Sequence, residues 1–344
     1  MDFTLSNEQR AWQMTARKFA EEEIRPISLE RDDIADPRET FDWEIIKKGS
    51  KLGFRTMAVP KEWGGHGTDF VTQALVMAEL AKGDSAISKT FSQCWKCLKL
   101  TAERHGDHWI LNGEKCFIAN ASVGKLFFID ARTDPNAPLR QSTTMFLVPR
   151  DTPGMRIGKV FNKSGWRFYQ NGEIIFDNAR VPHANVVGAV NGSDMKTHAA
   201  GDRTGGDLFG DLELAANALG VCDNACAMAL ALAQTKTQGG RPLFEQQVIQ
   251  LKLNKMHLLT EALRSFVMRI AWEHDHKVRS ANAGLCMNFS TDVIQEVTEL
   301  NLDLHAGAGV LDPRAEKLVR DAIIWSHLAG DSVQRMKATR RLAK

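Results

Sequence analysis

The chain has 344 residues, of which 43% are hydrophobic, so it can bury a large core, and its length alone predicts two or three domains. It carries 44 basic and 42 acidic residues for a net charge of +2, a balance that argues against a nucleic-acid or polyanion binder. The N-terminus has neither the basic start nor the apolar run of a signal peptide, and no apolar stretch approaches the ~18 residues of a membrane span. We therefore expect a soluble cytoplasmic protein without a membrane span.

Residues 1–97 have helical patterning and predict an N-terminal helical domain. The first segment, SNEQRAWQMTARKFAEEEI, offers Ser6 or Asn7 as a helix cap and spaces its apolar residues by three and four. Near the end of this part, Cys94 and Cys97 form a C-x-x-C. The sequence has no second such pair and no histidines at zinc-finger spacing, so we expect packed cysteine side chains and no metal site.

Residues 98–190 predict a β domain. Short apolar-rich runs such as KLFFIDART, TTMFLVPRD and GMRIGKVF alternate with turn signals, as they do in small barrels and sandwiches. Two dipeptides, Asn112-Gly113 and Asn171-Gly172, predict tight hairpin turns, because Asn-Gly favours the left-handed backbone that such turns need.

Residues 191–344 return to helical patterning. Four long amphipathic segments, from ELAANALGVCDNACAMALALAQ to AEKLVRDAIIWSHLAG, predict a C-terminal four-helix bundle. Stretches such as CAMALALA and LRSFVMRIAW are apolar on more than one helical face. Apolar surface of this kind predicts a homotetramer or a heteromer rather than a monomer.

This order of domains, with its local phrases, resembles the acyl-CoA dehydrogenase family. LGFRTMAVPKEWGGHG is similar to the family's LG…PEEYGG.G connection, and HWILNGEKCFIANA is similar to its flavin strand, Y.LNG.K.WITN. LHAGAGVLD…AEKLVRDA resembles its Q.HGG.GY…V.R..RDA, so the resemblance covers nearly the whole chain. It implies a mainly α fold with a central β-barrel, an FAD cofactor, an acyl-CoA substrate and an electron-transfer flavoprotein as partner.

The implied reaction removes two hydrogens from an acyl-CoA thioester. A base takes the proton from the carbon next to the thioester carbonyl, the α carbon, while hydride leaves the β carbon for flavin N5. An α proton is weakly acidic, so the base is expected to be a carboxylate in a dry pocket. The flavin is needed because no side chain accepts hydride.

The family's catalytic glutamate is absent from its usual place. Counted forward from Arg320-Asp321-Ala322, the position falls on Ala329. Counted back from Gln334-Arg335, it falls on Leu328, and neither residue is acidic. The nearest carboxylate is Asp331.

Some family members instead carry the base at the start of the first bundle helix. That position falls near Gly210, where Asp211 and Glu213 lie. The base has therefore moved to Glu213, Asp211 or Asp331, in this order of preference, or it has been lost. Helix capping is the alternative role of Asp331 and Asp211, and an acidic residue such as Glu213 is a common structural choice in the first turn of a helix.

A block of several dozen residues, which in the family includes a loop that holds flavin and CoA, has no counterpart here. CWKC is followed almost directly by LKLTAERHGDHW, which in the family lies beyond that loop. A helix would then run into a strand without turn residues at Cys97-Leu98. Either the deletion is natural or the sequence lacks a stretch of the natural chain, and we favour the second.

The resemblance implies three groups of FAD contacts, and each is altered here. Phe117, Ile118 and Ala119 stand where the flavin strand has Trp-Ile-Thr, so position 119 keeps its backbone N–H but lacks a hydroxyl. The second group falls at or just beyond the family's Arg-x-x-Phe-Gly, which reaches a neighbouring subunit's FAD, and comprises Lys236, Gln238, Leu243 and Gln246. Lysine keeps the positive charge of arginine but loses its two-pronged hydrogen bonding. The third group falls in the Gln-x-His-Gly-Gly near the pyrophosphate and comprises Asp303, Ala306 and Gly307. An acid at position 303 is unfavourable there unless it faces away.

Because the sequence departs from the family pattern at the base, at the missing block and at the FAD contacts, several functions remain open. The preferred one is an acyl-CoA dehydrogenase with a relocated base. A second is a degenerate subunit that completes the flavin or CoA site of a partner chain in a hetero-oligomer. A flavin monooxygenase or oxidase, or a lyase acting on a CoA ester, on the same fold are further alternatives.

Overall fold

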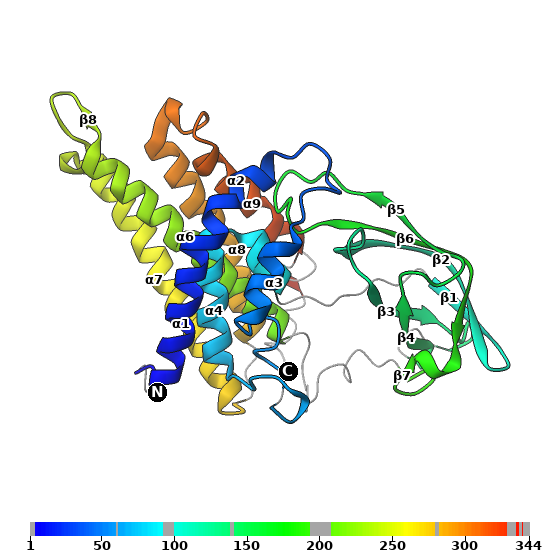
Figure 1. The fold of residues 1–344 in the computed structure, drawn as a ribbon. Coiled ribbons are helices and arrows are strands. Elements are labelled where there is room, and N and C mark those ends of the chain that lie inside the picture. Colours follow the sequence, from blue (N-terminus) through cyan, green and yellow to red (C-terminus); the bar gives the residue numbers. More distant parts are fainter. Residues whose placement is uncertain are drawn as a thin grey trace.

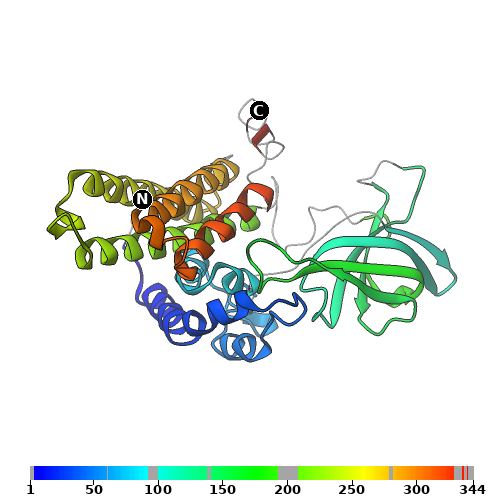
Figure 2. The ribbon, with the colours of Figure 1, turned by 90° about the horizontal axis from the view of Figure 1, so that it is seen from above.

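The computed structural model describes residues 4–59, 61–91, 100–137, 141–192, 208–278 and 282–328, together with positions 335, 336 and 339. Along the chain a helical part is followed by a β domain and then by a second helical part. The two helical parts pack together into one body, and the β domain stands at its side (Figures 1 and 2). The predicted order of elements is therefore confirmed.

The N-terminal helices begin with a capping box. The Ser6 hydroxyl accepts from the Gln9 N–H at 3.1 Å, and the Gln9 side chain accepts from the Ser6 N–H at 2.9 Å. These two bonds satisfy backbone donors that a helix start leaves open. The helices and helical turns that follow are α1 (Asn7–Phe19), η1 (Ala20–Ile24), α2 (Arg25–Asp33), α3 (Trp43–Lys51), η2 (Lys61–Trp63), α4 (Phe70–Gly83) and α5 (Ser85–Phe91).

The β domain is one seven-stranded sheet that coils on itself (Figure 1). The spatial order of its strands is β5-β6-β2-β1-β3-β4-β7. All neighbours pair antiparallel except β1 and β3, which are parallel. The strands are β1 (Leu100–His105), β2 (His108–Ala119), β3 (Leu126–Arg132), β4 (Thr143–Pro149), β5 (Met155–Val160), β6 (Asn171–Pro182) and, after the turn η4 (His183–Asn185), β7 (Val186–Val187).

Neither Asn-Gly pair forms the predicted hairpin turn. Strand β2 runs through Asn112 and Gly113, and the turn before it lies at Gly106-Asp107. Gly113 has φ +124° and lies at a register shift against β6, so its backbone freedom is used in a β-bulge. Gly172 pairs with both β2 and β5, where a Cβ would lie 3.0 Å from the Lys159 carbonyl oxygen. The small residue there permits a close approach of strands.

The C-terminal part is built around one central helix, α6 (Leu208–Thr235), which packs against α4, α7 and α8. The segment Asp211–Thr235 is long and apolar enough to cross a membrane by length and composition alone, but most of it is buried in the fold. We attribute its apolar character to a place in the core. The remaining elements are β8 (Thr237–Gln238), β9 (Arg241–Pro242), η5 (Leu243–Glu245), α7 (Gln247–Asp275), α8 (Asn282–His305), η6 (Ala306–Ala308) and α9 (Pro313–Leu328).

A buried ionic network joins the three parts of the chain. The Lys317 ammonium of α9 contacts Asp84 Oδ2 at 2.9 Å and Asp321 Oδ2 at 2.6 Å. Asp84 precedes α5, and its Oδ1 accepts from the first N–H groups of that helix. Asp321 Oδ1 accepts from the Trp166 N–H, in the β5–β6 loop, at 2.7 Å. One cation and two carboxylates thereby hold the β5–β6 loop against both helical parts.

Candidate functional site

The end of β2, where a flavin strand is predicted, has a distorted backbone. Phe117 has φ +55°, a region that bulky side chains seldom adopt, and it lies within a β-bulge between Lys115 and Ile118. Its ring is 68% exposed and packs on Phe161 at 4.8 Å between centroids. A strained backbone that presents an exposed aromatic ring is typical of a functional site.

The two residues after Phe117 pack against different cores. Ile118 is buried in the sheet core, and Ala119 packs against the large helical core. Asn120 follows with φ +52°, and its N–H donates to the Gln170 carbonyl oxygen at 2.7 Å. The strand end is therefore fastened to the start of β6.

This strand end fits a flavin by its donors and acceptors. The side-chain oxygen of Asn120 is buried and accepts no hydrogen bond from any described residue. A buried acceptor without a partner is costly, so a ligand N–H would satisfy it. A flavin ring carries such a group and also has an aromatic face for Phe117. The residues present fit the cofactor that the resemblance implies.

The start of α6 holds a buried ion pair. Glu213 is 3% exposed, and both of its carboxylate oxygens accept hydrogen bonds from the Lys89 ammonium, at 2.8 and 2.9 Å. Lys89 lies on α5 with an 8% exposed side chain. Asp211, two residues earlier on α6, is only half buried. Of Asp211 and Glu213, the two candidate bases that the structure describes, Glu213 is the one placed in a dry setting with a cationic partner.

The start of α6 and the end of α9 are in direct contact, and the flavin strand borders the same helical core. This core extends through both helical parts and includes Leu212, Leu214 and Trp325, and Ala119 packs against it. Trp325 donates its Nε1 hydrogen to the Leu214 carbonyl oxygen at 3.1 Å. The third candidate base, Asp331, and Ala329 lie outside the described residues, as do Cys94 and Cys97.

The second predicted group of cofactor contacts lies far from the flavin strand. Lys236 and Gln238 belong to the β8–β9 hairpin, at the end of the helical body opposite the β domain (Figures 1 and 2). Gln238 is exposed, and its carbonyl oxygen accepts from the Gln246 side chain at 3.1 Å. Leu243 is 4% exposed, so its side chain serves the core. Within one copy of the chain, this hairpin therefore lies too far from the flavin strand to contact the same cofactor.

The third predicted group lies at the end of α8. Asp303 is exposed and forms an ion pair with Lys252 of α7. Its charge is thereby offset. Ala306 has φ +52°, and Gly307 has open space where a Cβ would lie. Both residues are exposed, so their backbone is accessible to a ligand.

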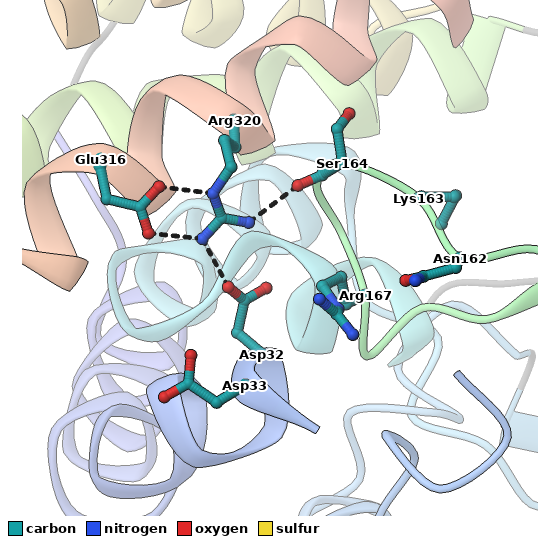
Figure 3. Close-up of a pocket in the computed structure, with 8 residues that line it drawn as sticks. All are labelled: Asp32, Asp33, Asn162, Lys163, Ser164, Arg167, Glu316 and Arg320. Atoms are coloured by element: carbon teal, nitrogen blue, oxygen red, sulfur yellow. Dashed lines mark hydrogen bonds and ion pairs between the residues drawn. The ribbon is translucent and has the colours of Figure 1, made fainter. Parts of the chain in front are cut away.

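A polar cavity of about 430 Å³ lies between α2, the β5–β6 loop and α9 (Figure 3). Arg320 is the hub of its hydrogen bonds, and it donates to Glu316, to Asp32 at 2.6 Å and to the Ser164 carbonyl oxygen at 2.8 Å. Because Arg320 links α9 to α2 and to the β5–β6 loop, the cavity belongs to the junction between the three parts, although Asp32 Oδ1 and Arg167 Nε have no hydrogen-bond partner among the described residues. Its lining residues are Asp32, Asp33, Asn162, Lys163, Ser164, Arg167, Glu316 and Arg320.

The sequence did not predict two groups of residues around the site. Lys89, the partner of Glu213, was signalled only as a single cation in the otherwise uncharged helix SAISKTF. The residues that support the flavin strand from β6, Gln170 and Asn171, carried no signal beyond an Asn-Gly pair that indicated a turn. Pairing between distant segments is needed to identify both groups.

Comparison with known proteins matches all three parts of the chain. Sequence models of the acyl-CoA dehydrogenase N-terminal, middle and C-terminal domains match residues 6–108, 96–179 and 210–343. A probable acyl-CoA dehydrogenase of Bacillus subtilis, YngJ, is 28% identical, and the alignment covers all of both proteins. That alignment runs over 390 positions against the 344 residues here, so the relative carries residues that this chain lacks.

Solved structures give the same result for the fold. A chain in the structure of the electron transferring flavoprotein of Acidaminococcus fermentans is 26% identical, with a TM-score of 0.88 over 99% of both chains. Butyryl-CoA dehydrogenase from Megasphaera elsdenii superposes with a TM-score of 0.89 over the whole of both chains at 24% identity. The second likeness concerns the fold alone.

Proposed function

The chain belongs to the acyl-CoA dehydrogenase family, and from that premise we propose that it oxidises an acyl-CoA thioester to its α,β-unsaturated form, with Glu213 as the base. The observation that carries the proposal is the buried carboxylate of Glu213 at the start of α6, in the helical core that the strained flavin strand borders through Ala119. A carboxylate in a dry setting beside a flavin is what removal of a weakly acidic α proton requires.

FAD would supply the acceptor for the hydride. This chain's residues would bind and orient it: Asn120 offers a buried acceptor, and Phe117 offers an aromatic face. The Ala306 and Gly307 backbone is accessible for the pyrophosphate end. Family relatives support FAD as the cofactor, and the acyl chain length stays open.

The Lys89 ammonium donates to both carboxylate oxygens of Glu213, so it competes with a substrate for the carboxylate. We propose that a bound thioester displaces Lys89 from one oxygen. Lys89 then stays on the other oxygen, and the released oxygen takes the α proton.

The test is anaerobic bleaching of the flavin absorbance on addition of an acyl-CoA. Glu213→Gln should slow this reduction by roughly 10²–10⁴-fold, while Asp211→Asn and Asp331→Asn should leave it near the parent rate. Because Glu213→Gln leaves Lys89 buried without a counter-charge, a double variant, Lys89→Met with Glu213→Gln, serves as the neutral control. Reduction at the parent rate in both variants that lack Glu213 would exclude it as the base.

One observation favours an alternative, the degenerate subunit. Lys89 holds both oxygens of Glu213, and a chain without catalysis would also tolerate this buried contact as a structural ion pair. In that case the purified chain either lacks flavin until a partner chain is added, or holds flavin that no thioester bleaches. A flavin monooxygenase or a lyase gives bound flavin that a thioester does not bleach, without need of a partner chain.

We further propose that the chain self-associates and passes its electrons to an electron-transferring flavoprotein. The β8–β9 hairpin can serve a cofactor only in a second copy or a partner chain, given its distance from the flavin strand (Figure 1). An exposed apolar stripe on and before α7 supports such an interface, and comprises Phe244, Val248, Leu251 and Leu258. The likeness to a chain in the Acidaminococcus structure supports the electron acceptor. A cytoplasmic location stays a prediction.

A further inference from the structure

The loop between β5 and β6 contains a lysine, Lys163, that contacts the residues at the start of β6, next to the flavin strand. Lys163 donates from Nζ to the Tyr169 carbonyl oxygen and to Asn171 Oδ1, both at 2.6 Å. The ammonium also lies 5.2 Å from the centre of the Tyr169 ring. Lys163 is therefore fixed from three directions at the start of β6.

Asn171 connects this lysine to the strained residue of the flavin strand. Its backbone pairs with Ala119, and its side-chain amide donates to the Phe117 carbonyl oxygen over 3.5 Å. An amide can be turned either way, but the protonated lysine ammonium only donates hydrogen bonds. Lys163 therefore holds the Asn171 amide with its oxygen toward the lysine and its NH₂ group toward the Phe117 carbonyl.

The setting of Lys163 leaves its charge weakly compensated. Burial lowers the pKa of Lys163 to about 7, against a smaller opposing effect of Asp321. A neutral amine has two hydrogens, and the two acceptors at 2.6 Å match them. The charged and titratable groups around this lysine are Asp32 and Asp33 of α2, Arg167 and Tyr169 of its own loop, and Glu316, Arg320 and Asp321 of α9. Arg320 binds Asp32 and Glu316, and Lys317 binds Asp321.

We propose that Lys163, acting through Asn171, is a positioning residue that holds the strained Phe117 backbone in its flavin-binding form, and that the proton on its amine changes the bound flavin. The inference rests on the proposed function, because it needs a flavin at this strand. A protonated amine adds positive charge behind the strand, so it favours the negatively charged reduced flavin. The flavin is therefore easier to reduce when Lys163 is protonated.

The experiment compares FAD binding and the pH dependence of the bound flavin in matched variants. The parent should show one transition in flavin absorbance or reduction potential with a midpoint near pH 7, the pKa of about 7 set by burial. Lys163→Met should lack the transition and bind FAD about tenfold more weakly, the effect of one lost hydrogen bond to a charged group. Lys163→Arg stays charged, so it should also lack the transition but keep the low-pH spectrum throughout.

Two further variants separate positioning from a general effect on folding. Lys159→Met removes an exposed lysine from the neighbouring strand β5 and should behave as the parent. Asn171→Ala should weaken FAD binding as much as Lys163→Met does, and the double variant should lose no more, because both act through one contact chain. If Lys163→Met does not fold, Lys163→Arg and Asn171→Ala carry the same comparison.

The outcomes distinguish this inference from the proposed function. A parent protein that binds no FAD contradicts the proposed function itself. A parent that binds FAD, with a pH transition that persists in Lys163→Met and Lys163→Arg, overturns the inference about Lys163 alone. Additive losses in the double variant overturn the route through Asn171.

Discussion

Replacement of Lys317 by methionine should test the network that joins the three parts of the chain. Among the described residues, Lys317 is the cation that contacts both Asp84 and Asp321, and all three side chains are at most 6% exposed. Methionine has a similar length but no charge. The substitution therefore leaves two buried carboxylates without their shared partner.

The loss of stability can be worked out from the distances. Both carboxylate oxygens contact the same Nζ, at 2.9 and 2.6 Å, so they lie at most about 5.5 Å apart. Two unit charges at that separation repel by about 3 kcal/mol at an effective dielectric constant near 20. Broken buried ion pairs typically cost about 3–5 kcal/mol. We expect Lys317→Met to lower the free energy of unfolding by an amount in this range.

The loss should depend on pH in a defined direction. Burial already raises the pKa of Asp321, and Lys317 opposes that rise. Without Lys317 the pKa in the folded state rises further, so the folded chain binds more protons than the unfolded chain between the two pKa values. Stability of the variant relative to the parent therefore falls as pH rises through that window and recovers toward acid.

The assay is urea unfolding followed by tryptophan fluorescence at pH 7.5 and 5.5. Lys48→Met is the control, because Lys48 pairs with Glu23 at the surface, with a 54% exposed side chain, and should leave the midpoint unchanged. Adding Asp321→Asn to Lys317→Met should restore part of the stability, since one unpaired charge is removed. If Lys317→Met unfolds at the same midpoint as Lys48→Met, the network does not stabilise the fold as argued.

Two further predictions concern stability and assembly. Lys163 has a pKa of about 7 in the folded chain, so the unfolded chain binds more protons between that value and the ordinary lysine pKa. The free energy of unfolding of the parent should therefore rise with pH in this range, by up to about 1.4 kcal/mol per pH unit. Lys163→Met should lose this slope in urea titrations, and an unchanged slope would contradict the assigned pKa. Leu251→Asp, on the exposed stripe of α7, should lower the mass measured by light scattering, whereas Met14→Asp, equally exposed on α1, should not; equal masses would argue against the stripe as an interface.

Several features of this protein follow from local sequence. The capping box at Ser6 and Gln9 starts α1 at the expected place, and the spacing of apolar residues predicts the long helices of the bundle. These features depend on residues within a few positions of one another, so the local chain carries the information. The order of helical, β and helical parts was confirmed for the same reason.

The Asn-Gly pairs mark the limit of such local signals. Asn112-Gly113 and Asn171-Gly172 favour a left-handed backbone, but each lies in a strand that pairs on both sides. The hydrogen bonds that these strands form with neighbours on both sides outweigh the preference of a two-residue Asn-Gly segment for a turn. The glycines were therefore used for a bulge and for close approach between strands rather than for turns.

The sequence by itself determined the long helices, the order of the helical and β parts and the family, because amphipathic spacing and helix capping act over short distances. Only the tertiary structure decided which buried charges meet. Glu213 is paired with Lys89, which lies 124 positions earlier in the chain, and Asp321 holds the backbone of Trp166, 155 positions away. It also decided that the β8–β9 hairpin lies far from the flavin strand of the same copy (Figure 1). The physical reason is that apolar periodicity specifies which face of an element is buried, whereas the partner of a buried charge depends on how distant elements pack.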